Sequence, residues 1–147
     1  MENVSVLLIS PFDSDQRLLA SIFTRSKWRL AAATNLDTAR EILSSQPPSI
    51  VVTEDRFPGG NWEAVLDVVT CAGPVRPRVI VVSRLADDNL WQRVLDAGGY
   101  DVLEKPFEQE SLFLSISQAW RQWQCESTRI RTARLPVDEA AVTLAAS

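Results

Sequence analysis

The chain has 147 residues, of which 46% are hydrophobic, and this is enough apolar side chain for one domain with its own core. Its net charge of -4 argues against a nucleic-acid-binding surface, which is usually basic. We expect a cytoplasmic protein, because the sequence shows neither a secretory leader nor an apolar run of the roughly 18 residues that a membrane helix needs.

Histidine is absent from the chain, so the commonest general base and metal ligand is missing. The two cysteines, Cys71 and Cys125, fall in a predicted loop and near the end of the last predicted helix, without metal-binding spacing. We expect them to be reduced thiols rather than a disulfide. Catalysis by a Ser-His or Cys-His pair is excluded.

Five short apolar or β-branched runs predict strands. They cover residues 4–9, 28–33, 50–53, 78–83 and 101–104. The second run is polar enough for a sheet edge, whereas the third, Ile50 to Thr53, is typical of a strand buried on both faces. Pro58-Gly59-Gly60 must then turn the chain, which leaves Glu54 and Asp55 at the carboxyl end of a central strand.

Each predicted strand is followed by a segment with apolar residues at helical spacing. The residues expected to cap or start the first four helices are Asp13 or Ser14, Thr34 or Asn35, Asn61, and Asp87 with Asp88. Gly98-Gly99 should end the fourth helix with positive backbone angles. The last helix carries an apolar stripe through Trp120 and Trp123. After this stripe, residues 124–147 predict a tail that is mobile or only partly helical.

The repeated strand-helix pattern with short connections predicts parallel strands and right-handed crossovers. The fold class is therefore a doubly wound, three-layer α/β domain over residues 1–123. In such a sheet the carboxyl ends of the first, third, fourth and fifth strands converge on one cleft. The residues delivered to this cleft are Ser10, Pro11, Glu54, Ser83 and Lys105.

This set resembles the receiver domain of bacterial response regulators, the CheY-like fold. The resemblance covers about residues 4–123 and is strongest in residues 54–58 and 98–107, the second of which ends in Lys105-Pro106-Phe107. It implies a five-stranded sheet in the order 2-1-3-4-5. It also implies phosphoryl transfer from a histidine kinase to an aspartate on the third strand, with Mg²⁺ held by that aspartate and an acidic pair. Ser83 and Lys105 match the family's phosphoryl-binding residues, and Pro106 would follow a cis bond.

Glu54 stands at the phosphoacceptor position, and Ser10 and Pro11 replace the acidic pair. With one carboxylate left, Mg²⁺ should bind weakly or not at all. The extra methylene of Glu54 displaces its oxygen by more than the roughly 1 Å that can cost about a hundredfold in rate. Asp13 and Asp55 are spare carboxylates that could restore a metal site in a shifted position.

Val102 occupies the place of the family's switch aromatic, and Tyr100 is expected two residues earlier on the same face of the strand. Most of the tryptophans should be core. Trp62 and Trp91 are expected on helices near the cleft, and an apolar stripe that exceeds what the sheet can cover would be a docking or dimer surface.

The preferred hypothesis is a degenerate single-domain receiver, in which a Glu54–Lys105 ion pair partly imitates a phosphoaspartate. It would act by contact with a histidine kinase or a separate output protein, and a homodimer through the face of the fourth and fifth helices is expected. One alternative is a working receiver that uses Glu54 or Asp55 as acceptor. Another is a small α/β enzyme or nucleotide binder, against which the lack of a glycine-rich phosphate loop counts.

Overall fold

The computed structural model describes residues 4–24, 28–71, 75–105 and 108–133. The main sheet consists of β1 (Ser5–Ile9), β2 (Arg29–Ala33), β3 (Ile50–Glu54), β6 (Arg78–Ser83) and β7 (Asp101–Glu104). These strands are all parallel and lie in the order β2-β1-β3-β6-β7. The predicted fold class and strand order are confirmed.

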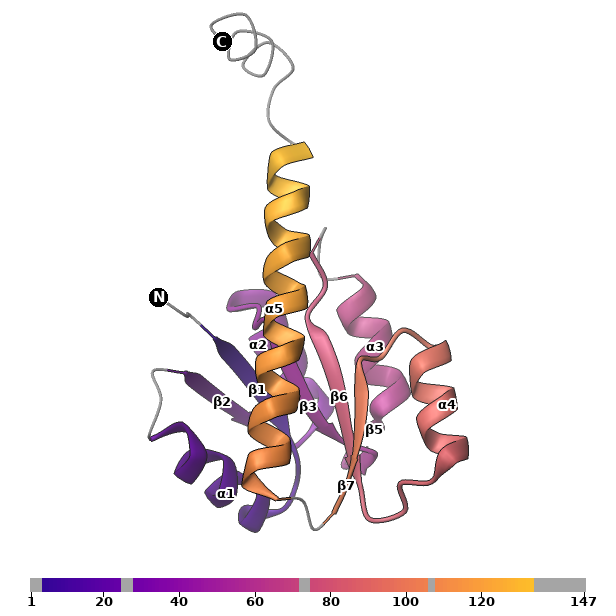
Figure 1. The fold of residues 1–147 in the computed structure, drawn as a ribbon. Coiled ribbons are helices and arrows are strands. Elements are labelled where there is room, and N and C mark those ends of the chain that lie inside the picture. Colours follow the sequence, from indigo (N-terminus) through magenta and orange to yellow (C-terminus); the bar gives the residue numbers. More distant parts are fainter. Residues whose placement is uncertain (1–3, 25–27, 72–74, 106–107, 134–147) are drawn as a thin grey trace, which may run out of the picture.

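Helices cover both faces of this sheet (Figure 1). They are α1 (Asp13–Phe23), α2 (Leu36–Ser45), α3 (Trp62–Thr70), α4 (Asp88–Asp96) and α5 (Gln109–Ala133). Two separate clusters of buried residues join the helices to the sheet: α2, α3 and α4 pack on one face, and α1 and α5 pack on the other. The structure is therefore the expected three-layer domain.

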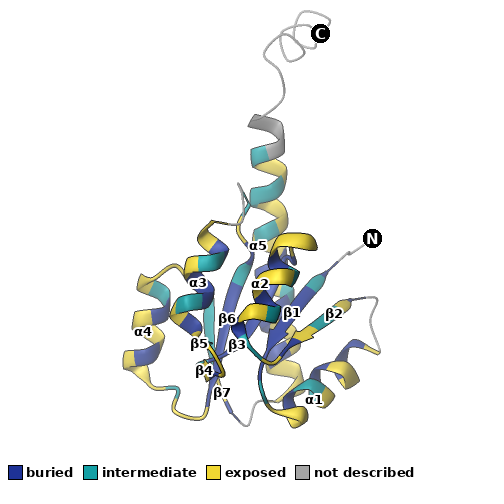
Figure 2. Cartoon of the chain, turned by 180° about the vertical axis from the view of Figure 1, so that it is seen from behind, coloured by how far each residue is buried: buried dark blue, intermediate teal, exposed yellow. Residues whose placement is uncertain are grey.

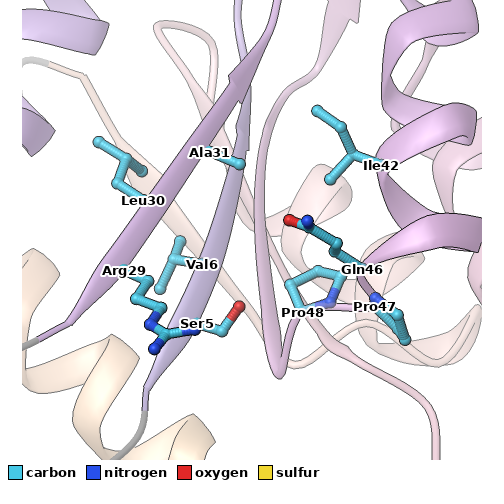
Figure 3. Close-up of a pocket in the computed structure, with 9 residues that line it drawn as sticks. All are labelled: Ser5, Val6, Arg29, Leu30, Ala31, Ile42, Gln46, Pro47 and Pro48. Carbon is cyan, nitrogen blue, oxygen red and sulfur yellow. The ribbon is translucent and has the colours of Figure 1, made fainter.

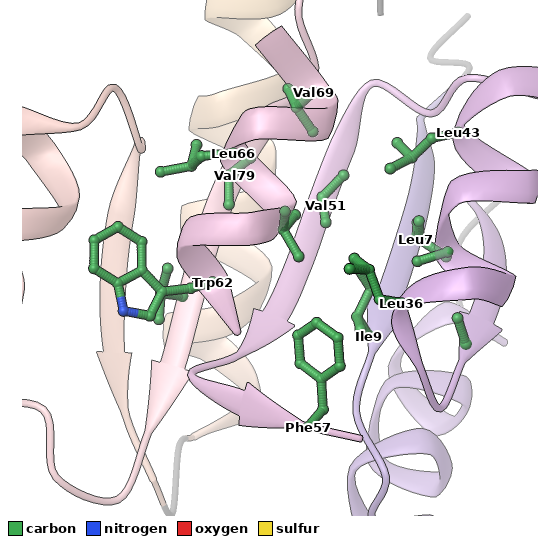
Figure 4. Packing of buried hydrophobic residues seen from close by; sticks show 14 of the residues in the cluster. Leu7, Ile9, Leu36, Leu43, Val51, Phe57, Trp62, Leu66, Val69 and Val79 are labelled. Carbon is green, nitrogen blue, oxygen red and sulfur yellow. The ribbon is translucent and has the colours of Figure 1, made fainter. Parts of the chain in front are cut away.

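Alternation along the central strands divides their side chains between these two clusters. Val51 belongs to the cluster under α2, α3 and α4, and its neighbour Val52 belongs to the cluster under α1 and α5. Figure 4 shows the first cluster, and Figure 2 shows that burial is concentrated in the sheet. Every residue of β3 is buried, which confirms the prediction of a strand covered on both faces.

Side-chain caps begin three of the helices as predicted. The side chains of Asn35, Asn61 and Asp87 each accept a hydrogen bond from a backbone N–H of the following first turn. The prediction for α1 was wrong, because its N-cap is Phe12 and Asp13 is already its first helical residue. At that place the carboxylate of Asp13 favours the helix through the macrodipole rather than through a cap.

Glycine follows α4 as expected, but of the two residues predicted to have positive φ, Gly98 has it and Gly99 does not. Gly98 has φ 101°, a conformation that a residue with a side chain rarely adopts. At Gly99 a Cβ would come within 2.4 Å of the Val94 side chain. The backbone N–H of Gly99 donates to the Val94 carbonyl at 2.8 Å, so both glycines let the chain turn directly from α4 into β7.

Two features of the structure differ from the expected elements. A small antiparallel hairpin, β4 (Arg56–Phe57) and β5 (Gly60–Asn61), forms where only a turn was expected. Helix α5 runs on to Ala133, so residues 124–133 are helical, and Figure 1 shows this part extending past the sheet. An ion pair between Arg78 and Glu126 ties the extension to the start of β6. Residues 134–147 and the predicted cis-peptide residue Pro106 lie outside the described residues.

A groove of about 590 Å³ lies between the edge strand β2 and the end of α2 (Figure 3). Ala31 and Ile42 line its apolar part, and Ser5 and Arg29 line its polar part. Ser5 and Arg29 are the first residues of their strands, so the groove lies toward the amino ends of the sheet, away from the predicted cleft. Among the described residues, no helix is long and apolar enough to cross a membrane.

Candidate functional site

Lys105 lies directly after β7, and its backbone N–H donates to the Ser83 carbonyl at 2.9 Å. Its side chain turns inward and is 8% exposed. The Nζ atom forms ion pairs with Oδ2 of Asp15 and Oε2 of Glu54, and it lies 4.7 Å from the centroid of the Phe12 ring. The ammonium group is therefore held between two carboxylates and covered by an aromatic ring.

Glu54 is the last residue of β3, between β1 and β6, and is 6% exposed. The ion pair with Lys105 that the sequence predicted is present. Burial raises the pKa of the Glu54 carboxyl above its ordinary value, because the loss of water outweighs the lowering effect of Lys105. The negative charges of Asp15 and Asp55 raise this pKa further.

The second carboxylate at Lys105 comes from Asp15, which the sequence analysis did not single out. Asp15 lies in the first turn of α1 and is 8% exposed. It precedes the buried Leu19 by four residues and the buried Ile22 by seven, so it lies on the inner side of the helix. This spacing was the available signal, since an acidic residue on the apolar stripe of a helix needs a buried partner.

Ser10 holds Asp15 in place rather than taking the role of an acidic ligand. Its hydroxyl donates to Asp15 Oδ2 at 2.8 Å and accepts from the Phe12 N–H at 3.1 Å. Pro11, which stands between Ser10 and Phe12 in the sequence, is half-buried. Helix α1 therefore delivers a carboxylate to the cleft, and this residue, Asp15, comes five positions after Ser10, the first residue at the place of the acidic pair.

Ser83 lies at the carboxyl end of β6, as predicted, but it has a carboxylate partner of its own. Its hydroxyl donates to Asp55 Oδ2 at 3.0 Å and accepts from the Leu85 N–H at 3.0 Å. Asp55 extends β3 by one further hydrogen bond, from its N–H to the Val82 carbonyl at 3.1 Å. Asp55 thus lies beside Ser83, while Glu54, one residue earlier, faces Lys105.

Val102 and Tyr100 lie on different sides of the sheet. Val102 packs against the cluster under α2, α3 and α4, whereas Tyr100 packs against the cluster under α1 and α5. The expectation that both occupy the same face was wrong, because Tyr100 precedes the first residue of β7 and the strand alternation does not extend to it.

The two spare carboxylates, Asp13 and Asp55, have different surroundings. Asp13 is exposed, and Asp55 is engaged by Ser83. Within residues 4–24, 28–71, 75–105 and 108–133, no group of three His, Cys, Asp or Glu residues is placed to hold a metal ion.

Comparison with known proteins identifies a family. Residues 6–117 match the response regulator receiver domain family. An NtrX-like response regulator of Rickettsia conorii is 26% identical over 133 residues, which are 89% of this chain and 27% of that protein. The chain thus spans about a quarter of the length of this curated relative.

Solved structures show the same fold. The signal receiver domain of a Luxo repressor protein from Vibrio parahaemolyticus superposes with a TM-score of 0.80 at 19% identity, covering 86% of this chain and 97% of that one. The beryllofluoride-activated NtrC4 receiver domain dimer gives a TM-score of 0.75 at 23% identity, covering 81% of this chain and 98% of that one.

Proposed function

We propose, from the premise that this chain belongs to the response regulator receiver domain family, that it signals by protein contact without phosphorylation of Glu54 or of an aspartate. The family places it in two-component signal transduction. The observation that carries the finer proposal is the pair of carboxylates, Glu54 and Asp15, bound to the single buried ammonium of Lys105.

Lys105 is the residue that would bind an oxygen of an incoming phosphoryl group, according to the family resemblance. Both of its carboxylate contacts are internal, and the Phe12 ring covers it. A phosphoryl donor would have to displace a buried ion pair to reach the ammonium, which costs several kcal/mol before any bond forms. The Glu54 side chain therefore occupies permanently, as a partner of Lys105, part of the place that a transferred phosphoryl group would take.

The carboxylates of the cleft do not fit the octahedral oxygen shell that Mg²⁺ demands. Asp15 accepts from Ser10 and Lys105, Glu54 is bound to Lys105, and Asp55 accepts from Ser83. An ammonium group thus occupies the space between the two carboxylates from which a metal ion would need its ligands. No catalytic step through a metal ion follows from this arrangement.

Ser83 supports the same conclusion. In a receiver that responds to phosphorylation, this hydroxyl would be released to contact the phosphoryl group, as the resemblance implies. Here its hydroxyl proton is donated to Asp55, and the hydroxyl oxygen accepts from the Leu85 N–H. Carboxyl groups of the chain itself therefore lie where phosphoryl oxygens would bind at the two family residues: Glu54 and Asp15 at Lys105, and Asp55 at Ser83.

The test is incubation of the full chain with acetyl phosphate and Mg²⁺, followed by intact-mass measurement, with beryllofluoride and Mg²⁺ followed by NMR in parallel. We expect no mass gain and no magnesium-dependent shift. Stoichiometric modification would overturn the proposal. In that case, an Asp55→Asn variant would decide between the acceptors, because loss of modification would assign it to Asp55 and its persistence would assign it to Glu54.

The contact surface we propose is the face formed by α4, β7 and α5, used by a partner protein or by a second copy. Trp91 on α4 is 46% exposed. Arg93, about 200° further around the helix, contacts Trp62 and Glu63 of α3. Trp91 therefore lies on the side of α4 away from α3, toward the open edge at β7. An exposed tryptophan is a typical anchor of a protein interface.

A further inference from the structure

We propose that the closed cleft binds a proton, which Glu54 carries, and that opening of the cleft releases it. This inference rests on the proposed function, because it assigns another input to a site that does not take a phosphoryl group. The proton passes from water to the Glu54 carboxylate, which becomes a neutral acid. Lys105 stays charged and keeps its ion pair with Asp15.

The charge count of the cleft is the first reason. One ammonium faces two carboxylates, and all three residues are buried. With both carboxylates ionised, the cluster has an excess negative charge in a site from which water is largely excluded. Such a charge is costly, and a buried carboxyl group usually becomes neutral instead. One proton removes the excess without disturbing the packing.

The hydrogen bonds decide which carboxylate takes the proton. Asp15 Oδ2 accepts from the Ser10 hydroxyl at 2.8 Å and also contacts Lys105. Glu54 Oε2 has the Lys105 ammonium as its partner and accepts no other hydrogen bond within the described residues. Asp15 Oδ2 thus has two donors and Glu54 Oε2 has one, so the proton is better placed on Glu54.

The charged groups that act on Glu54 come from three places in the fold. They are Lys105 after β7, Asp15 on α1 and Asp55 at the end of β3. The two negative groups outnumber the positive one. Burial raises the pKa of the Glu54 carboxyl, and these two carboxylates add to that effect, so the charge balance and the geometry agree.

Opening of the cleft would reverse this effect. Any state that exposes Glu54 to water restores its ordinary acidity, so the proton leaves and Lys105 becomes accessible. By linkage, acidification favours the closed cleft, and a rise in pH favours the open one. A partner that binds the open state would therefore bind more tightly as pH rises through the raised pKa of Glu54.

The experiment is a pH titration of the full chain with ¹³C-labelled glutamate and aspartate, followed by NMR of the side-chain carboxyl carbons. We expect one glutamate carboxyl to titrate at clearly higher pH than the others, and its signal to be missing in Glu54→Gln. In Asp15→Asn the same carboxyl should titrate at lower pH, since a negative neighbour is gone and Lys105 is shared no longer. Glu41→Gln removes the same charge from an exposed site on α2 and should leave the titration unchanged.

If all glutamate carboxyl groups of the wild-type chain titrate together in the ordinary pH range, the proposal is overturned. This outcome needs no variant, so it holds even if a variant fails to fold. An unmoved titration in folded Asp15→Asn would overturn the role of the shared lysine. The acetyl phosphate test has a separate readout. If the protein is modified by acetyl phosphate but the Glu54 carboxyl still titrates at raised pH, only the proposed function is refuted. If the protein is not modified and no glutamate titrates at raised pH, only proton binding is refuted.

Discussion

Lys105 has two acidic partners, Asp15 and Glu54, and its ammonium group is the positive charge that faces both. Asp15, Glu54 and Lys105 come from α1, β3 and the segment after β7, so the ion pairs join both ends of the domain to its centre. The pairs are buried, and the cost of removing one member is therefore larger than the net worth of the contact. The residue-scale predictions follow from this asymmetry.

Replacement of Lys105 by Met should lower the free energy of unfolding by about 3–5 kcal/mol at neutral pH, because two buried carboxylates then face each other without a cation. Urea denaturation measures this loss. The double variant Lys105→Met with Glu54→Gln should recover part of it. Arg40→Met, on the exposed side of α2, should change stability by less than about 0.5 kcal/mol. A loss at Lys105 as small as that of the control would show that the ion pairs do not form in solution.

The raised pKa of Glu54 sets the direction in which the free energy of unfolding should change with pH. Between the ordinary and the raised pKa, the folded protein binds a proton that the unfolded chain does not. The free energy of unfolding should therefore fall as pH rises through this window. Urea denaturation at a series of pH values measures the slope. In Glu54→Gln this part of the slope should vanish, and a steeper fall in the variant than in the wild type would contradict the assignment.

At the scale of elements, α5 has two parts with different supports. Its first part packs on the sheet through Leu112, Ile116, Ala119 and Trp120. Its second part, past Trp123, is joined to the domain by the ion pair between Glu126 and Arg78. This pair is partly exposed, with side-chain exposures of 34% and 18%, so its contribution should be about 1 kcal/mol or less.

Glu126→Gln should therefore leave the global stability nearly unchanged but loosen the extension. Hydrogen exchange of the backbone amides of residues 124–130 should become faster by up to about fivefold, which corresponds to about 1 kcal/mol. Mass spectrometry of peptides from α5 measures this effect. Glu110→Gln, an exposed charge in the first turn of the same helix, is the matched control and should not affect these amides. Equal exchange in both variants would show that the ion pair does not hold the extension.

At the scale of the whole molecule, the sheet separates two cores, and the open edge at β7 joins the faces of α4 and α5. The residues of β7 are only partly buried up to Leu103, and Glu104 is exposed. An edge of this kind is available for association, and the proposed contact surface lies here.

Trp91→Ser should weaken self-association through this surface at least tenfold, if a second copy is the partner, because an interface tryptophan often contributes 2 kcal/mol or more. Light scattering with size-exclusion chromatography over a range of protein concentrations measures the dissociation constant. Arg40→Ser on α2 is the control for a surface substitution. If the protein is strictly monomeric at the highest concentration, a second copy does not bind the proposed contact surface, and a different protein is its partner.

Much of the fold could be predicted because it depends on residues close together in the chain. The periodicity of apolar residues predicted the five strands and the helices between them, and Asn35, Asn61 and Asp87 are caps because each bonds an N–H three residues away. The hairpin of β4 and β5 was not predicted, and the tail from residue 124 was predicted to be mobile or only partly helical, since neither segment shows a strong apolar pattern. The extension is helical where it projects past the sheet and contacts the domain through a charged pair.

The sequence by itself determined the element pattern and the delivery of Glu54, Ser83 and Lys105 to one edge of the sheet, because the carboxyl ends of parallel strands must meet there. Only the tertiary structure decided the partners of these side chains. Asp15 reaches Lys105 across 90 positions of the chain, and Ser83 bonds Asp55 rather than facing an open cleft. Contacts of this kind join segments that are far apart in the chain. They depend on how the helices and strands pack together in the complete domain.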